Sequence, residues 1–186
     1  MASRKITIIV VIAAAVIAAS LIAFSLMQSN KIAYPPNSDQ TNPTYATIDG
    51  VECRPAESLD MHIHTHLDVI VNDHAYTVPG AIGIPGNQCF YWLHTHSTDG
   101  IIHIESPRQM NFTLGQFIDI WDHTQHDPTL SASIAAGPVT AYVNGVKYQG
   151  DYRTVQLNSR EEIALVIGSS STLPIPATYP DSGPPA

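Results

Sequence analysis

The stretch MHIHTHLDVIVNDHAYTV, residues 61–78, carries the strongest strand signal in the chain. Polar and apolar residues alternate at its start, which is typical of a strand with one buried face, and the run then turns apolar. Asn72 and Asp73 interrupt it, and both residue types favour tight turns. The stretch therefore predicts a long strand that returns through a hairpin.

Strand signals also dominate the rest of the domain. Two dipeptides, Asp99-Gly100 and Asn144-Gly145, are favoured in two-residue hairpin turns, and the second lies between Val/Tyr runs. Further strand segments are predicted at residues 88–96, 101–105, 139–150, 154–157 and 162–168.

One segment, residues 113–123, has helical spacing instead. Its apolar residues follow the i, i+3, i+4, i+7 pattern at Leu114, Phe117, Ile118 and Trp121. Thr113 and Gln116 have the spacing of a capping box, and Pro128 is expected to end the element. We predict a mainly β fold, a β-sandwich or open barrel, with one packed α-helix.

The ends of the chain differ from this domain. Residues 6–27 are apolar and uncharged, and about 22 residues suffice to span the roughly 30 Å hydrocarbon core of a bilayer. Arg4 and Lys5 precede them, so the positive-inside rule predicts a single-pass anchor in the cell membrane with an extracytoplasmic C-terminal domain. A cleaved signal peptide is the alternative. The predicted organisation is a transmembrane anchor over 1–29, an extended tether over 30–47, a histidine-rich β domain over 48–168 and a disordered Pro/Ser tail over 169–186.

Charge and cysteine content restrict the partners. After the anchor the chain has sixteen acidic and six basic residues, a net charge of −10. This excess disfavours nucleic acid and anionic lipid headgroups as partners and suits a site that collects cations. In an oxidising compartment, Cys53 and Cys89 are expected to form a disulfide, although thiolate ligation of a metal stays open.

The densest histidine group lies in LHTHSTDGIIHIE, residues 93–105. Side chains at i and i+2 share one face of a strand. A two-residue turn at Asp99-Gly100 would place His96 opposite His103 and His94 opposite Glu105, so that all four side chains share one face. Three imidazoles and a carboxylate match the ligand sets of zinc, copper and iron sites. The alternative is a half-exposed hairpin whose histidines are surface groups.

A second group, His62, His64 and His66, shares one face of the first strand. Its outer members are roughly 13 Å apart, so two of the three can share an ion while the third serves elsewhere. The complete set of predicted metal ligands is His94, His96, His103, Glu105, His62, His64 and His66.

These residues favour a membrane-anchored extracytoplasmic protein that binds a transition metal, copper or zinc. Because imidazole ligands must be neutral, binding is expected to weaken below about pH 6. One alternative is a zinc-dependent lyase or hydrolase, carbonic-anhydrase-like or hydrolytic, with three histidine ligands and an open position. Another is an accessory subunit of a membrane enzyme complex. No catalytic residue is assigned.

In LHTHSTDGIIHIESP (93–107) and FTLGQFIDIW (112–121), the chain resembles a family of uncharacterised, membrane-anchored or secreted histidine-rich proteins of bacteria and archaea, ammonia-oxidising archaea in particular. The resemblance covers residues 60–167. It implies an extracytoplasmic setting in which copper proteins are abundant, and it implies no catalytic role. The histidine spacing is also similar to that of cupins, but Glu105 follows His103 here, which departs from the cupin pattern.

Overall fold

The computed structural model describes residues 45–169, 172–180 and 183–184. The predicted anchor and most of the predicted tether lie outside these residues. Among the helices that are described, none combines the length and the apolar character needed to cross a bilayer.

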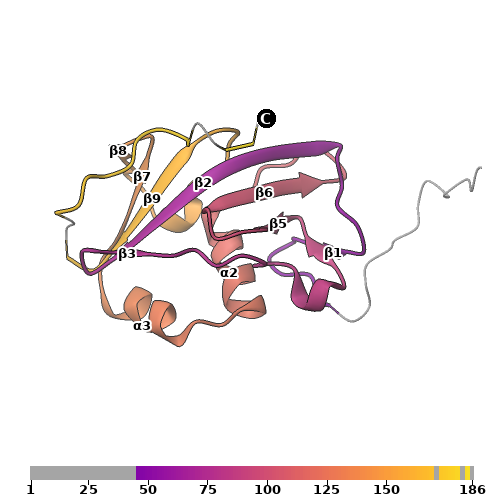
Figure 1. Cartoon of the computed structure of the whole chain (residues 1–186), viewed down its shortest axis with the longest axis horizontal. Coiled ribbons are helices and arrows are strands. Elements are labelled where there is room, and N and C mark those ends of the chain that lie inside the picture. The colour runs from indigo at the N-terminus through magenta and orange to yellow at the C-terminus, as the bar shows by residue number, and fades with distance from the viewer. Residues whose placement is uncertain (1–44, 170–171, 181–182, 185–186) are drawn as a thin grey trace, which may run out of the picture. The chain divides into compact units, whose positions relative to one another are not determined.

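Strand β2 (Met61–Val71) forms the centre of the fold (Figure 1). In the described part of the chain, seven strands form one sheet in the order β5-β6-β2-β9-β7-β8, with β3 also paired to β2. Strands β1 and β4 form a separate two-stranded ribbon. The other strands are β1 (Cys53–Arg54), β3 (His74–Tyr76), β4 (Phe90–Tyr91), β5 (Leu93–His94), β6 (Ile101–Ser106), β7 (Val139–Val143), β8 (Val146–Lys147) and β9 (Glu162–Ile167).

The two halves of β2 have different neighbours. Its first half, from Met61 to His66, pairs antiparallel with β6. Its second half, from His66 to Val71, pairs parallel with β9 and also forms the hairpin with β3. The apolar second half is flanked by strands on both edges, which fits the continuous hydrophobic run in its sequence.

Both predicted hairpins with Asn in the turn are confirmed. Asn72 and Asp73 have φ values of 47° and 66°, and Asn144 and Gly145 have values of 49° and 77°. Positive φ at both central residues is the signature of a type I′ turn, whose twist matches the strands it joins.

The predicted helix is confirmed as α2 (Leu114–Thr124), and its capping box is present. The Thr113 hydroxyl accepts from the Gln116 backbone N–H, and the Gln116 side chain accepts from the Thr113 N–H. A second helix, α3 (Pro128–Ala136), was not predicted. Asp127 caps its N-terminus by accepting two backbone N–H bonds. Pro128 therefore begins a helix at the N1 position, where its missing N–H costs nothing.

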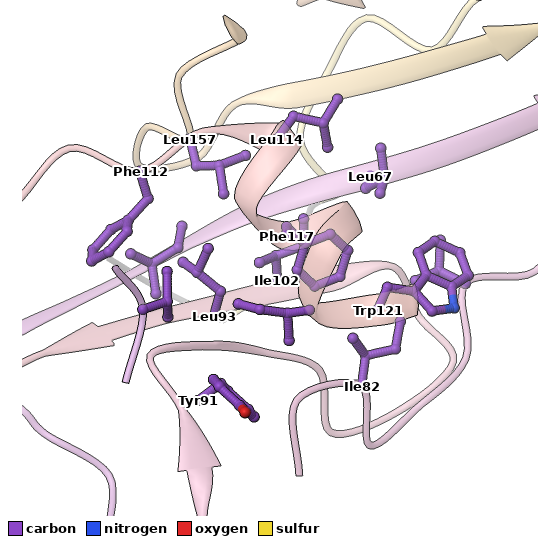
Figure 2. Packing of buried hydrophobic residues seen from close by; sticks show 14 of the residues in the cluster. Leu67, Ile82, Tyr91, Leu93, Ile102, Phe112, Leu114, Phe117, Trp121 and Leu157 are labelled. Carbon is purple, nitrogen blue, oxygen red and sulfur yellow. The ribbon is translucent and has the colours of Figure 1, made fainter. Parts of the chain in front are cut away.

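The main core lies between the sheet and α2 (Figure 2). Phe117 and Trp121 of the helix pack over Leu67, Leu93 and Ile102 of the sheet. Figure 1 shows both helices below the strands. Because residues alternate across a strand, the neighbours of these apolar residues in β2, β5 and β6 point to the opposite face.

The prediction of a mainly β domain with a packed helix is confirmed, but the described residues form one seven-stranded sheet and a small ribbon in place of the predicted β-sandwich or open barrel. The sheet is open, and helices cover its core face. Residues 154–157 were predicted as a strand. They contain the end of a 3₁₀ turn, and one isolated bridge joins Gln156 to Thr113.

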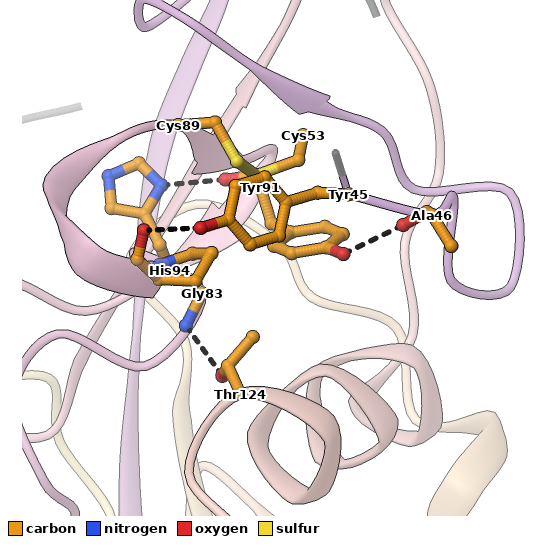
Figure 3. Close-up of a disulfide and its surroundings, with 9 residues drawn as sticks. Tyr45, Ala46, Cys53, Gly83, Cys89, Tyr91, His94 and Thr124 are labelled. Carbon is orange, nitrogen blue, oxygen red and sulfur yellow. Dashed lines mark hydrogen bonds between the residues drawn. A yellow bond between two sulfur atoms is a disulfide. The ribbon is translucent and has the colours of Figure 1, made fainter. Parts of the chain in front are cut away.

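The predicted disulfide is present between Cys53 and Cys89, so neither thiolate is a free metal ligand (Figure 3). It ties β1 to the segment before β4. Beside it, the buried Tyr91 side chain donates from its hydroxyl to the Ala46 carbonyl at 2.7 Å.

The described residues of the predicted Pro/Ser tail lie against the domain. The Thr172 hydroxyl and backbone N–H donate to Asp73 at 2.5 and 2.6 Å. The guanidinium of Arg160 lies 4.8 Å from the ring centre of Tyr179. Thr172 and Tyr179 thus attach this segment to side chains of the folded domain.

Candidate metal centre

A row of three directly paired histidines crosses the sheet. His94 of β5 pairs with His103 of β6, and His103 pairs with His64 of β2. Glu105, two residues after His103, pairs with His62 in the same way. Paired residues project to the same side of a sheet, so these five side chains gather on the face opposite α2.

The predicted pairing of β5 with β6 is wrong by two residues. His94, not His96, lies opposite His103. After His94 the chain leaves β6, because Thr95 exchanges backbone hydrogen bonds with the 81–82 segment at 2.8 and 3.0 Å. The Gly100 carbonyl instead accepts from the Leu67 N–H at 2.9 Å. A shift of two residues in the pairing of β5 with β6 keeps each side chain on the same face of the sheet. The predicted group of His94, His96, His103 and Glu105 therefore still lies together.

His94 and His96 converge on one point together with Glu57. Their Nε2 atoms are 3.2 Å apart. The Glu57 Oε1 atom lies 3.3 Å from Nε2 of His96 and 3.7 Å from Nε2 of His94. Glu57 was not predicted, because it lies in an irregular segment whose sequence has no periodic pattern to show its direction.

His62 and His64 form a second convergent pair. Their Nε2 atoms are 3.1 Å apart, and the Glu105 Oε1 atom is 3.2 Å from Nε2 of His62. His64 is buried, whereas His62 is 40% exposed. This pair therefore faces solvent on one side.

His103 lies between the two pairs. Its ring lies next to the rings of all four histidines of the two pairs. Its Nδ1 is 3.5 Å from Glu105 Oε1. Within the described residues, Nδ1 of His103 and Oε2 of Glu105 are buried and have no hydrogen-bond partner. Buried polar atoms of this kind call for an explanation, such as a bound ion.

The tautomer of His94 is set by its surroundings. Its Nδ1 lies 2.9 Å from the Tyr91 carbonyl oxygen, which only accepts, so Nδ1 carries the proton (Figure 3). Burial lowers the pKa of His94 to about 4, and the ring is neutral at physiological pH. Nε2 therefore presents a lone pair toward His96 and Glu57. Metal-binding histidines are commonly oriented by such a hydrogen bond from the other ring nitrogen.

Glu105 remains a carboxylate although its side chain is only 2% exposed. Burial raises its pKa, but the interactions with His103, His94 and His62 outweigh burial and lower the pKa below the usual range. An ionised carboxylate thus lies among the imidazoles.

His66 does not join this cluster. Its Nδ1 lies 2.8 Å from Glu162 Oε2, and its Nε2 lies 2.8 Å from the Asp99 carbonyl oxygen. Burial lowers the pKa of His66, but the bonds to Glu162 outweigh burial and raise it overall. Both ring nitrogens of His66 are thus engaged away from the cluster. His66, Asp68 and Glu162 are close enough to one another to form a separate group of potential metal ligands.

The convergent side chains can hold a metal ion. Among the described residues, one group of potential ligand atoms comprises His94, His96, His103 and Glu105, and another comprises His62, His64 and His103, with all atoms of a group within 4.8 Å of one another. A surface pocket of about 390 Å³ opens over the cluster, and it is lined by Glu57, His62, His64, His96, His103, Glu105 and Pro184.

No protein-family model, curated protein or solved structure matches this chain, so its chemistry is inferred from the site itself.

Proposed function

We propose that this protein binds a transition-metal ion, copper or zinc, through the histidine cluster of β2, β5 and β6. The observation that carries the proposal is the convergence of His94 and His96, whose Nε2 atoms are 3.2 Å apart. Two imidazole nitrogens on a tetrahedral ion, each about 2.0–2.1 Å from it, are separated by about 3.3–3.4 Å. The rings are thus near the spacing that a shared ion requires before any ion binds.

The donor chemistry favours borderline transition metals. Imidazole nitrogens suit zinc, copper, iron and nickel, whereas calcium and magnesium take oxygen ligands. The neutral ring of His94, oriented by the Tyr91 carbonyl, is ready to donate without first losing a proton. The carboxylate of Glu105 offsets part of the charge of a divalent ion.

The proposed location is the outer side of the cell membrane, with the domain held by an N-terminal anchor. The Cys53–Cys89 disulfide supports an oxidising compartment, where such bonds persist. The uncharged apolar run at residues 6–27 supports the anchor.

The test is elemental analysis of the full-length chain purified in detergent, beside the His94→Ala/His96→Ala variant. We expect the wild type to retain metal after dialysis and the variant to lose the ion that His94 and His96 hold. The matched control is His74→Ala/His123→Ala, which removes two exposed histidines outside the cluster.

Because His94 is buried, its replacement can also disturb folding, so His96→Ala alone is a second variant. His96 is 44% exposed, and we expect its loss to weaken binding at least tenfold with an unchanged circular dichroism spectrum. Metal content and affinity equal to the wild type in both variants would exclude this site.

The pocket over the cluster favours one further function, zinc-dependent hydrolysis or hydration. An ion held by histidines beneath an open pocket keeps a position for water, and zinc lowers the pKa of bound water to about 7. Zinc-loaded protein would then hydrolyse p-nitrophenyl acetate or hydrate CO₂ faster than His96→Ala. Equal rates would leave metal binding as the function.

The accessory-subunit alternative has less support. A metal-free subunit of that kind would have its histidines split between two faces and a large apolar patch exposed to a partner. The paired register places the cluster on one face. Among the described residues, the exposed large apolar side chains are Leu59, Val146 and Leu173, which lie on separate segments of the chain.

A further inference from the structure

We propose that the cluster is a centre for two transition-metal ions, with His103 between them. This inference rests on the proposed function, and it adds the number of ions and the residue that joins them.

The first observation is that the cluster contains two convergent pairs rather than one. The Nε2 atoms of His94 and His96 are 3.2 Å apart, and those of His62 and His64 are 3.1 Å apart. Each spacing is near the roughly 3.3–3.4 Å of two imidazoles on one tetrahedral ion. Each pair therefore has the geometry of half a metal site.

A carboxylate lies next to each pair. Glu57 Oε1 lies 3.3 Å from His96 Nε2, and Glu105 Oε1 lies 3.2 Å from His62 Nε2. Glu105 is also close enough to His94, His96 and His103 to share an ion with them. Each pair thus has two nitrogens and a neighbouring carboxylate. A tetrahedral ion at either pair needs one more ligand.

His103 is placed to supply that ligand on both sides. Its ring centre is 4.4 Å from that of His96 and 5.3 Å from that of His94. On the other side it is 4.6 Å from the ring centre of His64 and 6.3 Å from that of His62. His103 accordingly belongs to both groups of potential ligand atoms.

The number of donors also exceeds what one ion can use. Five imidazoles and two carboxylates converge here, whereas zinc sites are almost always four-coordinate. One four-coordinate ion therefore uses at most four of these seven groups. Nδ1 of His103 and Oε2 of the 2% exposed Glu105 already lack hydrogen-bond partners within the described residues.

The ligands offset three of the four positive charges of two divalent ions. Two divalent ions bring four positive charges, and the carboxylates of Glu57 and Glu105 offset two of them. When both nitrogens of His103 bind metal, its ring proton leaves to solvent and the resulting imidazolate offsets a third. The remaining four imidazoles bind as neutral ligands.

The test is a titration of the metal-free, full-length chain in detergent with Cu(II) or Zn(II) alone, read by calorimetry and elemental analysis. We expect two ions in the wild type and one ion each in His62→Ala/His64→Ala and in His94→Ala/His96→Ala. His74→Ala/His123→Ala, the matched control, should bind two.

Electron paramagnetic resonance of the copper-loaded chain tests the bridge. Two Cu(II) ions joined through His103 couple their spins, so the wild type should show a signal well below two spins. Each pair variant, holding one ion, should show one full spin. His103→Ala should lose the coupling.

The outcomes separate the two proposals. One ion in the wild type, unchanged in His62→Ala/His64→Ala, overturns the two-ion centre and leaves the proposed function intact. Two ions in that variant also overturn it, because the second ion then lies elsewhere. No bound ion in the wild type refutes the proposed function itself. If the double variant fails to fold, the 40% exposed His62 is replaced alone, and an unchanged affinity for the second ion refutes the centre.

Discussion

The burial of His94 should make the metal-free domain lose stability in acid. Its ring is fully buried, and burial lowers its pKa from 6.5 to about 4. Each pKa unit corresponds to about 1.4 kcal/mol, so the difference amounts to about 3 kcal/mol of stability. In the unfolded chain the same ring takes up a proton near pH 6.5, as an unperturbed histidine does.

The sign of the pH effect on stability follows from proton uptake by the unfolded state. The folded pKa is depressed, so between pH 6.5 and pH 4 the unfolded state binds more protons at His94 than the folded state. Its contribution is fully present above pH 6.5 and is lost progressively as the pH falls to about 4. Below that value the loss is complete.

We compare the free energy of unfolding of the wild type with that of His94→Asn. The Asn amide can still donate a hydrogen bond to the Tyr91 carbonyl. Urea unfolding with a chelator present, followed by tryptophan fluorescence, measures the free energy of unfolding at several pH values. Both tryptophans of the chain, Trp92 and Trp121, are buried in the core and report on this domain.

Between pH 6.5 and pH 4 the wild type should lose about 3 kcal/mol more than the variant. All other titrating groups are common to both proteins, so the difference reports His94 together with its effect on the neighbouring Glu105. If the free energies of unfolding of the two proteins changed with pH in parallel, burial would not hold the His94 ring neutral. Nε2 of His94 would then not be available as a metal ligand without loss of a proton.

Three further predictions concern the same region. Metal affinity should fall as the pH drops below about 6, because protons compete for imidazole nitrogens, and unchanged affinity at pH 5 would contradict a histidine site. Gly83→Ala should destabilise the fold by about 1–3 kcal/mol in urea, because Gly83 has φ +73° and a Cβ there would lie 2.5 Å from the Leu93 carbonyl oxygen. The same substitution should weaken metal binding, because that Cβ would also lie 3.1 Å from the Cβ of His94. Cys53→Ser/Cys89→Ser should cost about 3–4 kcal/mol of unfolding free energy, and a wild-type urea midpoint would contradict this.

Local patterns in the sequence predicted the local structure well. The turn residues at 72–73 and 144–145 specified type I′ hairpins, because the required positive φ values suit Asn, Asp and Gly. Thr113 and Gln116 marked the start of α2 through hydrogen bonds made within one turn. Alternation along 93–105 correctly placed His94, His96, His103 and Glu105 together. Each of these interactions joins residues that are near each other in the chain.

Contacts of the site between residues far apart in the chain could not be predicted from local sequence patterns. The parallel pairing of β2 with β9, which separates His66 from the other histidines and joins it to Glu162, links residues 96 positions apart. Glu57 reaches the cluster from an irregular segment, where no period indicates direction. The offset of β5 against β6 arose because Thr95 bonds to residues 81–82 in preference to β6.

The sequence by itself determined which side chains share a face and where the turns and α2 begin, because alternation and backbone dihedral preferences act over a few residues. Only the tertiary structure decided which faces meet, because strand pairing is chosen by competition among distant partners for the same backbone groups and the same buried area. The row His94, His103, His64 combines both, since each residue lies on its predicted face and three separate strands bring them together.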